Sequence, residues 1–144
     1  MKRRVLVLLT AMLAACSAGD GSGPRTDCPQ NFVRTEPEPR AGVEAALVVF
    51  ECDDTSPRAA AIVTYPMGAQ GRRTAHTRVV TIHATQQAVD TGTVRLAETR
   101  APRLSFNWTE NSELEISYDP AATLVDPLPQ TDTYAIRYSP PLAQ

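Results

Sequence analysis

Residues 103–118 read RLSFNWTENSELEISY, and this stretch alternates apolar with polar side chains on both sides of a short polar segment. Alternation with a period of two is typical of an antiparallel strand that buries one face. The polar residues 109–112 separate the two runs, at a spacing typical of a hairpin loop. The stretch therefore predicts a β-hairpin whose buried face holds Phe106, Trp108, Leu114 and Ile116. Its outward positions are then Arg103, Asn107, Glu113 and Glu115.

Strand patterns continue on both sides of this hairpin. Residues 46–50 form an uninterrupted apolar run, which is expected of a strand covered on both faces. β-Branched or alternating runs occur at 59–65, 78–84, 93–97 and 134–138. Helix signals are weak, because residues 84–89 offer only a turn or two before Gly92. We therefore expect an all-β chain, a small antiparallel β-sandwich or partly closed barrel of about six or seven strands.

The first sixteen residues have the organisation of an export signal. Lys2, Arg3 and Arg4 are followed by the apolar run 5–13, which is shorter than the roughly 20 residues of a transmembrane helix. The run ends in Leu13-Ala14-Ala15-Cys16, which resembles the lipobox of bacterial lipoproteins. The resemblance implies that residues 1–15 are a signal peptide and that Cys16 is lipidated and becomes the new N-terminus. The alternative is an ordinary secreted protein cut near Ala15.

The same resemblance implies a location. Ser17 stands where an aspartate would indicate retention in the inner membrane of many Gram-negative bacteria. We therefore expect a protein of the cell envelope, lipid-anchored in the outer membrane and facing the periplasm or the cell surface. One acyl chain binds a membrane only marginally, whereas two or three make the attachment durable.

Beyond the signal peptide, composition suggests two parts. Residues 17–24 hold no hydrophobic side chain larger than alanine, and chains of this kind behave as flexible coil. Three prolines, at 29, 37 and 39, interrupt the residues that follow. We therefore expect a lipidated N-terminus and flexible tether over 16–42 and a single β domain over 43–144.

A second resemblance concerns the domain itself. Cys52 in a turn, followed by Trp108 and the Leu-x-Ile-x-Tyr sequence of 114–118, is similar to a group of uncharacterised small bacterial proteins. The similarity extends over roughly residues 47–138. That group typically has Gly-Ala-Thr-Thr after the cysteine, where this chain has Asp-Asp-Thr-Ser at 53–56. The resemblance implies a domain of this extent and identifies no site residue.

The charge of the chain argues against nucleic acid as a partner. The formal net charge is −2, and loss of residues 1–15 removes three basic residues and no acidic one, which makes it −5. A nucleic-acid-binding protein normally carries a basic stripe, and the arginines here are scattered. Arg72 and Arg73 are the only adjacent pair outside the signal peptide, in a polar loop after Gly68.

Two cysteines remain once Cys16 is assigned to the anchor. Cys28 and Cys52 are expected to form a disulfide, because exported chains meet an oxidising compartment. A thiol nucleophile or a metal-binding pair is the rival interpretation, but neither cysteine has a CxxC neighbour or a nearby histidine.

Other chemistry is sparse, and no cofactor is expected. His76 and His83 would face opposite sides of a regular strand, which disfavours a shared metal. Glu51, Asp53 and Asp54 could supply oxygen ligands to Ca²⁺, but they lack the spacing of a calcium loop. The aromatic residues could form a binding face, although their spacing favours core packing. They are Phe106, Trp108, Tyr118, Tyr134 and Tyr138.

These observations leave three hypotheses for function. The first is a lipid-anchored, non-enzymatic module that binds an envelope protein or polymer or plays a structural role. The second is a small periplasmic hydrolase or metal-dependent enzyme that uses His76 or His83. The third is an inhibitor of a lytic enzyme, with the loop 67–75 as the inserted segment.

Overall fold

The computed structural model describes residues 25–52, 56–68 and 76–140. The expected signal peptide, Cys16, Asp53, Asp54 and most of the loop 67–75 lie outside these residues. Among the helices of the described part of the chain, none has the length and apolar character needed to cross a bilayer.

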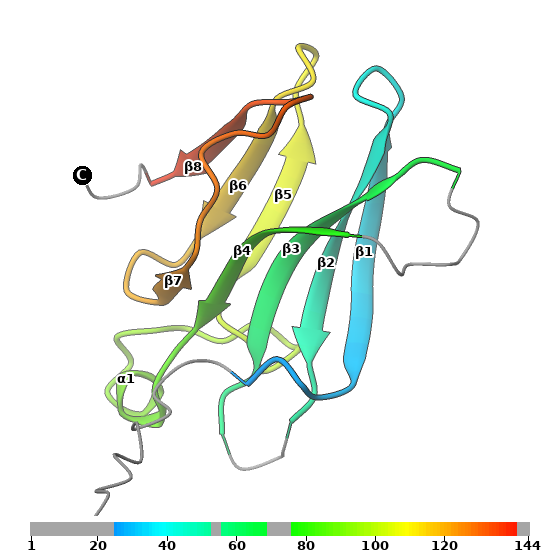
Figure 1. Cartoon of the computed structure of the whole chain (residues 1–144). Coiled ribbons are helices and arrows are strands. Elements are labelled where there is room, and N and C mark those ends of the chain that lie inside the picture. The colour runs from blue at the N-terminus through cyan, green and yellow to red at the C-terminus, as the bar shows by residue number, and fades with distance from the viewer. Residues whose placement is uncertain (1–24, 53–55, 69–75, 141–144) are drawn as a thin grey trace, which may run out of the picture.

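Two β-sheets make up the fold (Figure 1). The five-stranded sheet has the order β1-β2-β3-β4-β7, and the three-stranded sheet has the order β5-β6-β8. β5 contacts β1, β2 and β3 across the interface, so the two sheets pack as a β-sandwich. The elements are β1 (Gln30–Glu38), β2 (Val43–Phe50), β3 (Ala59–Pro66), β4 (Thr77–His83), α1 (Gln86–Asp90), β5 (Leu104–Trp108), β6 (Leu114–Tyr118), β7 (Thr123–Val125) and β8 (Ile136–Ser139).

The hairpin expected over 103–118 is confirmed. β5 and β6 pair antiparallel, with Phe106 opposite Ile116 and Trp108 opposite Leu114. Phe106, Leu114 and Ile116 are buried at the sheet interface, as the alternation predicts. Trp108 is only half-buried, because it lies at the end of β5 where the sandwich opens.

The expected tether boundary is wrong. Residues 30–38 form β1, which pairs antiparallel with β2 over its whole length and makes the edge of the larger sheet. An edge strand tolerates proline where its N–H would face solvent, and Pro37 is accommodated opposite Glu44. The ordered domain therefore begins before residue 43.

The strand count and direction also differ from expectation. Residues 93–97 form only an isolated bridge between Leu96 and Pro102, because no neighbouring strand lies there to pair with them. The crossing between β6 and β8 contains β7, which joins β4 in the other sheet. Because the chain crosses to the opposite sheet and back, β8 pairs parallel to β6. The described residues thus form eight strands, against about six or seven expected, and the all-β sandwich expected from the sequence is confirmed.

β2 and β3 are buried on both faces. Ala45 and Val49 of β2 face the smaller sheet, together with Ile62 of β3. Val48 and Phe50 belong to a second apolar cluster, which also holds Val63 and Tyr65 of β3. This two-sided burial explains why residues 46–50 show no alternation, as expected for a strand covered on both faces.

Two tyrosine hydroxyls form hydrogen bonds inside the sandwich. The Tyr134 hydroxyl lies 2.7 Å from the Thr64 hydroxyl of β3, and the Tyr138 hydroxyl donates to the Leu128 carbonyl at 2.8 Å. Both tyrosines are buried, at 7% exposure. Burial raises the pKa of Tyr134 and, more strongly, that of Tyr138 above the ordinary value of 10.0.

These raised pKa values predict a loss of stability in alkali. The unfolded chain releases its tyrosine protons near pH 10, whereas the folded chain retains them, so the folded state binds more protons above that pH. The free energy of unfolding should stay level below pH 10 and fall as the pH rises further. Tyr138→Phe should lower stability at pH 8, since it removes the hydrogen bond to Leu128, yet make the alkaline decline shallower. Urea unfolding between about pH 8 and pH 11 measures both effects. An unchanged decline in the variant would contradict this assignment.

Candidate functional site

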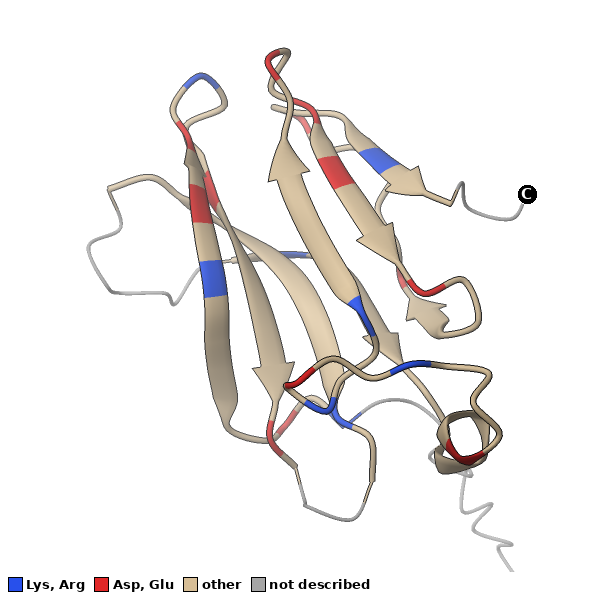
Figure 2. Cartoon of the chain, turned by 180° about the vertical axis from the view of Figure 1, so that it is seen from behind, with Lys and Arg blue, Asp and Glu red and all other residues tan. Residues whose placement is uncertain are grey.

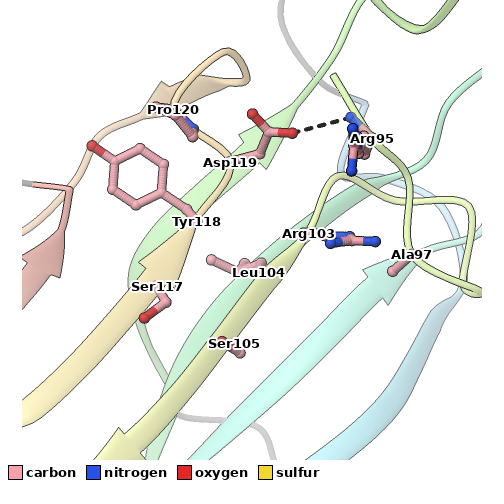
Figure 3. A pocket seen from close by; sticks show the side chains of 9 residues that line it. All are labelled: Arg95, Ala97, Arg103, Leu104, Ser105, Ser117, Tyr118, Asp119 and Pro120. Carbon is pink, nitrogen blue, oxygen red and sulfur yellow. Dashed lines mark hydrogen bonds between the residues drawn. The ribbon is translucent and has the colours of Figure 1, made fainter. Parts of the chain in front are cut away.

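A groove opens beside the beginning of β5 and the end of β6 (Figure 3). Its volume is about 640 Å³, which lies in the range of small-molecule binding pockets. We call it the Arg95–Arg103 groove. It is lined by Arg95, Ala97, Arg103, Leu104, Ser105, Ser117, Tyr118, Asp119 and Pro120.

Asp119 fixes the shape of the groove. Its Oδ2 accepts a hydrogen bond from the Arg95 backbone N–H at 3.0 Å, and its Oδ1 accepts one from the Ala121 N–H at 3.0 Å. The Asp119 N–H donates in turn to the Arg103 carbonyl at 3.1 Å. Asp119, the residue directly after β6, therefore holds the loop that carries Arg95 against the start of β5.

The loop that follows Arg95 is shaped by its own backbone. The Arg100 N–H donates to the Ala97 carbonyl at 2.9 Å, and the Ala97 N–H donates to the Ala101 carbonyl at 2.8 Å. Arg100 adopts a φ of 62°, which closes this tight turn. The turn returns the chain to β5 with Arg103 beside the groove.

Two guanidinium groups line the groove without a partner. Arg95 and Arg103 are exposed, and within the described residues neither side chain forms an ion pair or a hydrogen bond. A guanidinium presents several donors in a planar fork that matches a carboxylate or a phosphate. The groove therefore offers two such forks to a ligand.

Arg137 on the same sheet provides a contrast. It donates from Nε and Nη2 to Glu113 at 3.1 and 2.9 Å, and its Nη1 lies 3.5 Å from Glu115. Glu115 also accepts a hydrogen bond from Asn107 at 3.1 Å. The Arg137 guanidinium is thus already paired with two carboxylates of its own sheet, so it does not offer a second anion site. The acidic pair is only partly exposed and is held by Arg137.

Apolar and hydroxyl groups complete the lining of the groove. Leu104 and Tyr118 contribute carbon surface, and the Tyr118 ring packs edge-on against Tyr138 with 6.4 Å between centroids. Ser105 and Ser117 are exposed neighbours opposite each other on β5 and β6. In Figure 3 the two serines lie below the Tyr118 ring. Asp119 and the two arginines lie to the right of that ring, beside the loop that carries Arg95.

Among the described residues, acidic and basic positions are mixed rather than gathered in a patch of one sign. Figure 2 shows basic and acidic positions interspersed along the strands of the smaller sheet and on the loops at its lower end. The positive charge at the groove therefore comes from its two local guanidinium groups rather than from a general basic surface.

The disulfide expected from the sequence is confirmed. Cys28 and Cys52 are joined, with 4.9 Å between their Cα atoms. They flank the pair Gln30 and Phe50 at one end of β1 and β2. The Glu51 N–H also donates to the Pro29 carbonyl at 2.9 Å beside the disulfide. The rival roles of a thiol nucleophile or a metal-binding pair do not apply to bonded cysteines.

The two histidines do not come together. His76 precedes β4 and its ring lies 5.7 Å from the Tyr65 ring, whereas His83 ends β4 at the other end of the strand. Burial lowers the pKa of His83 below its ordinary value of 6.5. Glu51, one of the acidic residues considered for Ca²⁺, forms an ion pair with Arg58, with 3.2 Å between Oε1 and Nη1. Within the described residues, no three His, Cys, Asp or Glu side chains gather in a way that could hold a metal ion.

The aromatic residues lie mainly in the core, as their spacing predicts. Phe106, Tyr134 and Tyr138 are buried, and Trp108 packs on Tyr134 at 5.2 Å in an edge-to-face arrangement. Tyr118 is the exception, because it also lines the groove.

Sequence reasoning missed the groove. Arg95 and Asp119 are 24 positions apart, and neither belongs to a known motif. The available signal was Asp119-Pro120 directly after a strand, because aspartate in such a turn commonly binds backbone N–H groups.

No protein-family model, curated protein or solved structure matches this chain. The fold and the groove define it as a two-sheet β-sandwich with an open, arginine-lined groove.

Proposed function

We propose that this chain is a lipid-anchored cell-envelope protein whose β-sandwich is a non-enzymatic binding module. The Arg95–Arg103 groove is its binding surface, and an envelope polymer is its partner. The groove carries the binding role, because it presents two exposed guanidinium groups that form no ion pair within the described residues. The anchor rests on the sequence Leu13-Ala14-Ala15-Cys16.

A binding role also agrees with the distribution of titratable groups. The groove is lined by arginine, aspartate, tyrosine and serine, and no histidine or cysteine lines it. Acid–base catalysis needs a group whose pKa lies near the working pH, and arginine remains charged at all such values. Recognition of an anion is the chemistry that this set of side chains performs best.

The anchor predicts that Cys16→Ser abolishes acylation. The variant should accumulate as unprocessed precursor and incorporate no labelled palmitate, since the Cys16 thiol is the group that would carry the acyl chain. Metabolic labelling and membrane fractionation measure these effects, with Cys28→Ser/Cys52→Ser, which removes the disulfide but keeps Cys16, as the control. A Cys16→Ser protein that matures and fractionates like the wild type would show that the lipoprotein assignment is wrong.

The binding role predicts that the groove retains the protein on envelope polymer. The full chain is mixed with the detergent-insoluble polymer fraction of cells that lack the protein and is then sedimented. The wild type should cosediment, and Arg95→Ala/Arg103→Ala should remain in solution. Arg25→Ala/Arg40→Ala makes the same change in net charge on exposed arginines outside the groove and should cosediment like the wild type. If both double variants sediment equally, the groove is not the surface that binds the polymer.

A further inference from the structure

We infer that the Arg95–Arg103 groove binds a glycan whose sugar units carry carboxylate groups. This inference rests on the proposed binding role and adds the chemical class of the ligand. Four features of the groove support it: the two guanidinium groups, the carboxylate of Asp119, the serine hydroxyls, and the carbon surface of the Tyr118 ring.

The guanidinium groups require an anionic ligand. Arg95 lies in the loop before β5, and Arg103 is the residue immediately before this strand. Both side chains line the same groove. Each can form two parallel hydrogen bonds to a carboxylate, which gives fixed geometry as well as charge compensation. Because neither is engaged by the described residues, binding breaks no existing ion pair there.

Asp119 restricts the kind of anion. Two backbone N–H groups already bind its oxygens, yet a carboxylate has about four lone-pair positions, so it can accept further hydrogen bonds. A ligand beside it must therefore supply donors. Sugar hydroxyls supply such donors, whereas a phosphate dianion offers only acceptors and carries more charge to be repelled by Asp119.

The remaining lining fits a sugar ring. Sugar rings have apolar faces of C–H groups and polar hydroxyl edges. The partly exposed Tyr118 ring supplies surface for the faces, and Ser105 and Ser117 supply hydroxyls for the edges. The hydroxyls of both serines make no hydrogen bond within the described residues, so each can serve a ligand as donor and acceptor.

The test uses short oligosaccharides of galacturonic acid. The full chain, purified in neutral detergent, is titrated calorimetrically with tetragalacturonate at low salt, and with the same tetrasaccharide after methyl esterification of its carboxyls. The ester keeps the ring shape and the hydroxyls but removes the charge. We expect saturable binding of the acid, and at least about tenfold weaker binding of the ester, because charged hydrogen bonds are lost.

Variants locate the binding. Arg95→Ala/Arg103→Ala should weaken binding of tetragalacturonate at least about tenfold, and Arg25→Ala/Arg40→Ala should bind like the wild type. Ser117→Ala should cause a smaller loss, about twofold to tenfold, since it removes one neutral hydrogen-bonding group. Because the substituted side chains are exposed, thermal unfolding of each variant should match that of the wild type.

Several results would overturn the inference. These are no binding of tetragalacturonate, equal binding of acid and ester, and undiminished binding by Arg95→Ala/Arg103→Ala. Equal or tighter binding of tetraglutamate would assign the groove to an acidic peptide, and equal or tighter binding of tripolyphosphate would assign it to phosphate. If the arginine variant fails to sediment with envelope polymer while tetragalacturonate does not bind, the ligand class is wrong and the proposed function stands.

Discussion

Replacing Trp108 by alanine is expected to lower the free energy of unfolding by about 3 kcal/mol or more. The indole packs on Tyr134, and its Nε1 donates to the Glu36 carbonyl of β1 at 3.2 Å. Since Trp108 lies on the smaller sheet and Glu36 on the edge of the larger one, this side chain connects the two sheets. Such a loss is a large share of the 5–15 kcal/mol that typically holds a domain together.

Urea unfolding followed by far-ultraviolet circular dichroism measures the effect, because the variant no longer has its tryptophan fluorescence. Trp108→Phe separates packing from hydrogen bonding: it keeps an aromatic ring but removes the donor to Glu36, and should cost less than the alanine variant. Ser105→Ala, at an exposed position of the same strand, should stay within about 0.5 kcal/mol of the wild type. A Trp108→Ala protein as stable as the wild type would show that the indole does not connect the sheets.

The structure changes the expectation for the acidic residues of this hairpin. Glu113 has a side chain only 22% exposed and accepts two hydrogen bonds from Arg137. Glu113→Ala/Glu115→Ala should therefore lower the free energy of unfolding by about 1 kcal/mol. Adding Arg137→Ala to this double variant should recover part of the lost free energy of unfolding. Such a recovery would show that the arginine left without its partners accounts for that part of the loss. Equal losses with and without that third substitution would contradict this explanation.

Removal of the disulfide should produce the second large effect. Cys28→Ser/Cys52→Ser releases a link between residues 24 positions apart, and the chain-entropy estimate gives a loss of about 3 kcal/mol. In a domain of this size, that loss lowers the melting temperature by about 10 °C or more. The disulfide matters for β1 in particular, because this edge strand has only one neighbour, β2, within its sheet.

Thermal unfolding with and without a thiol reductant tests this prediction. Reductant should lower the melting temperature of the wild type to that of Cys28→Ser/Cys52→Ser and leave the variant unchanged. Hydrogen exchange should show the loss of protection concentrated at the Cys28 end of β1, around Gln30. A double variant that melts with the wild type would mean that the pairing of β1 with β2 is sufficient without the covalent link.

Local patterns predicted much of the fold. The alternation in 103–118 identified β5 and β6 and their inward side chains, because a period of two fixes which face each residue takes. The apolar run 46–50 correctly predicted burial on both faces of β2. The cysteines could be paired from composition and export alone. Each of these conclusions depends on neighbouring residues or on the chemistry of one residue type.

Pairing between strands could not be predicted in the same way. Residues 30–38 lack alternation and contain Pro37, so nothing local marks β1; the partner β2 makes it a strand. Residues 93–97 alternate well but have no strand beside them, so they form only one bridge. The crossing through β7, which turns β8 parallel to β6, depends on a contact with β4 some forty positions earlier in the chain.

The sequence by itself thus determined the strand character of most segments, the inward faces of the hairpin and the disulfide. The tertiary structure alone decided the division into two sheets and the groove. Arg95 and Asp119 are brought together by a hydrogen bond between the Arg95 backbone N–H and the end of a strand 24 positions later. The physical reason is that side-chain periodicity reports which face of a strand is buried, whereas a binding groove needs residues from several segments whose neighbours are set by the packing of the whole chain.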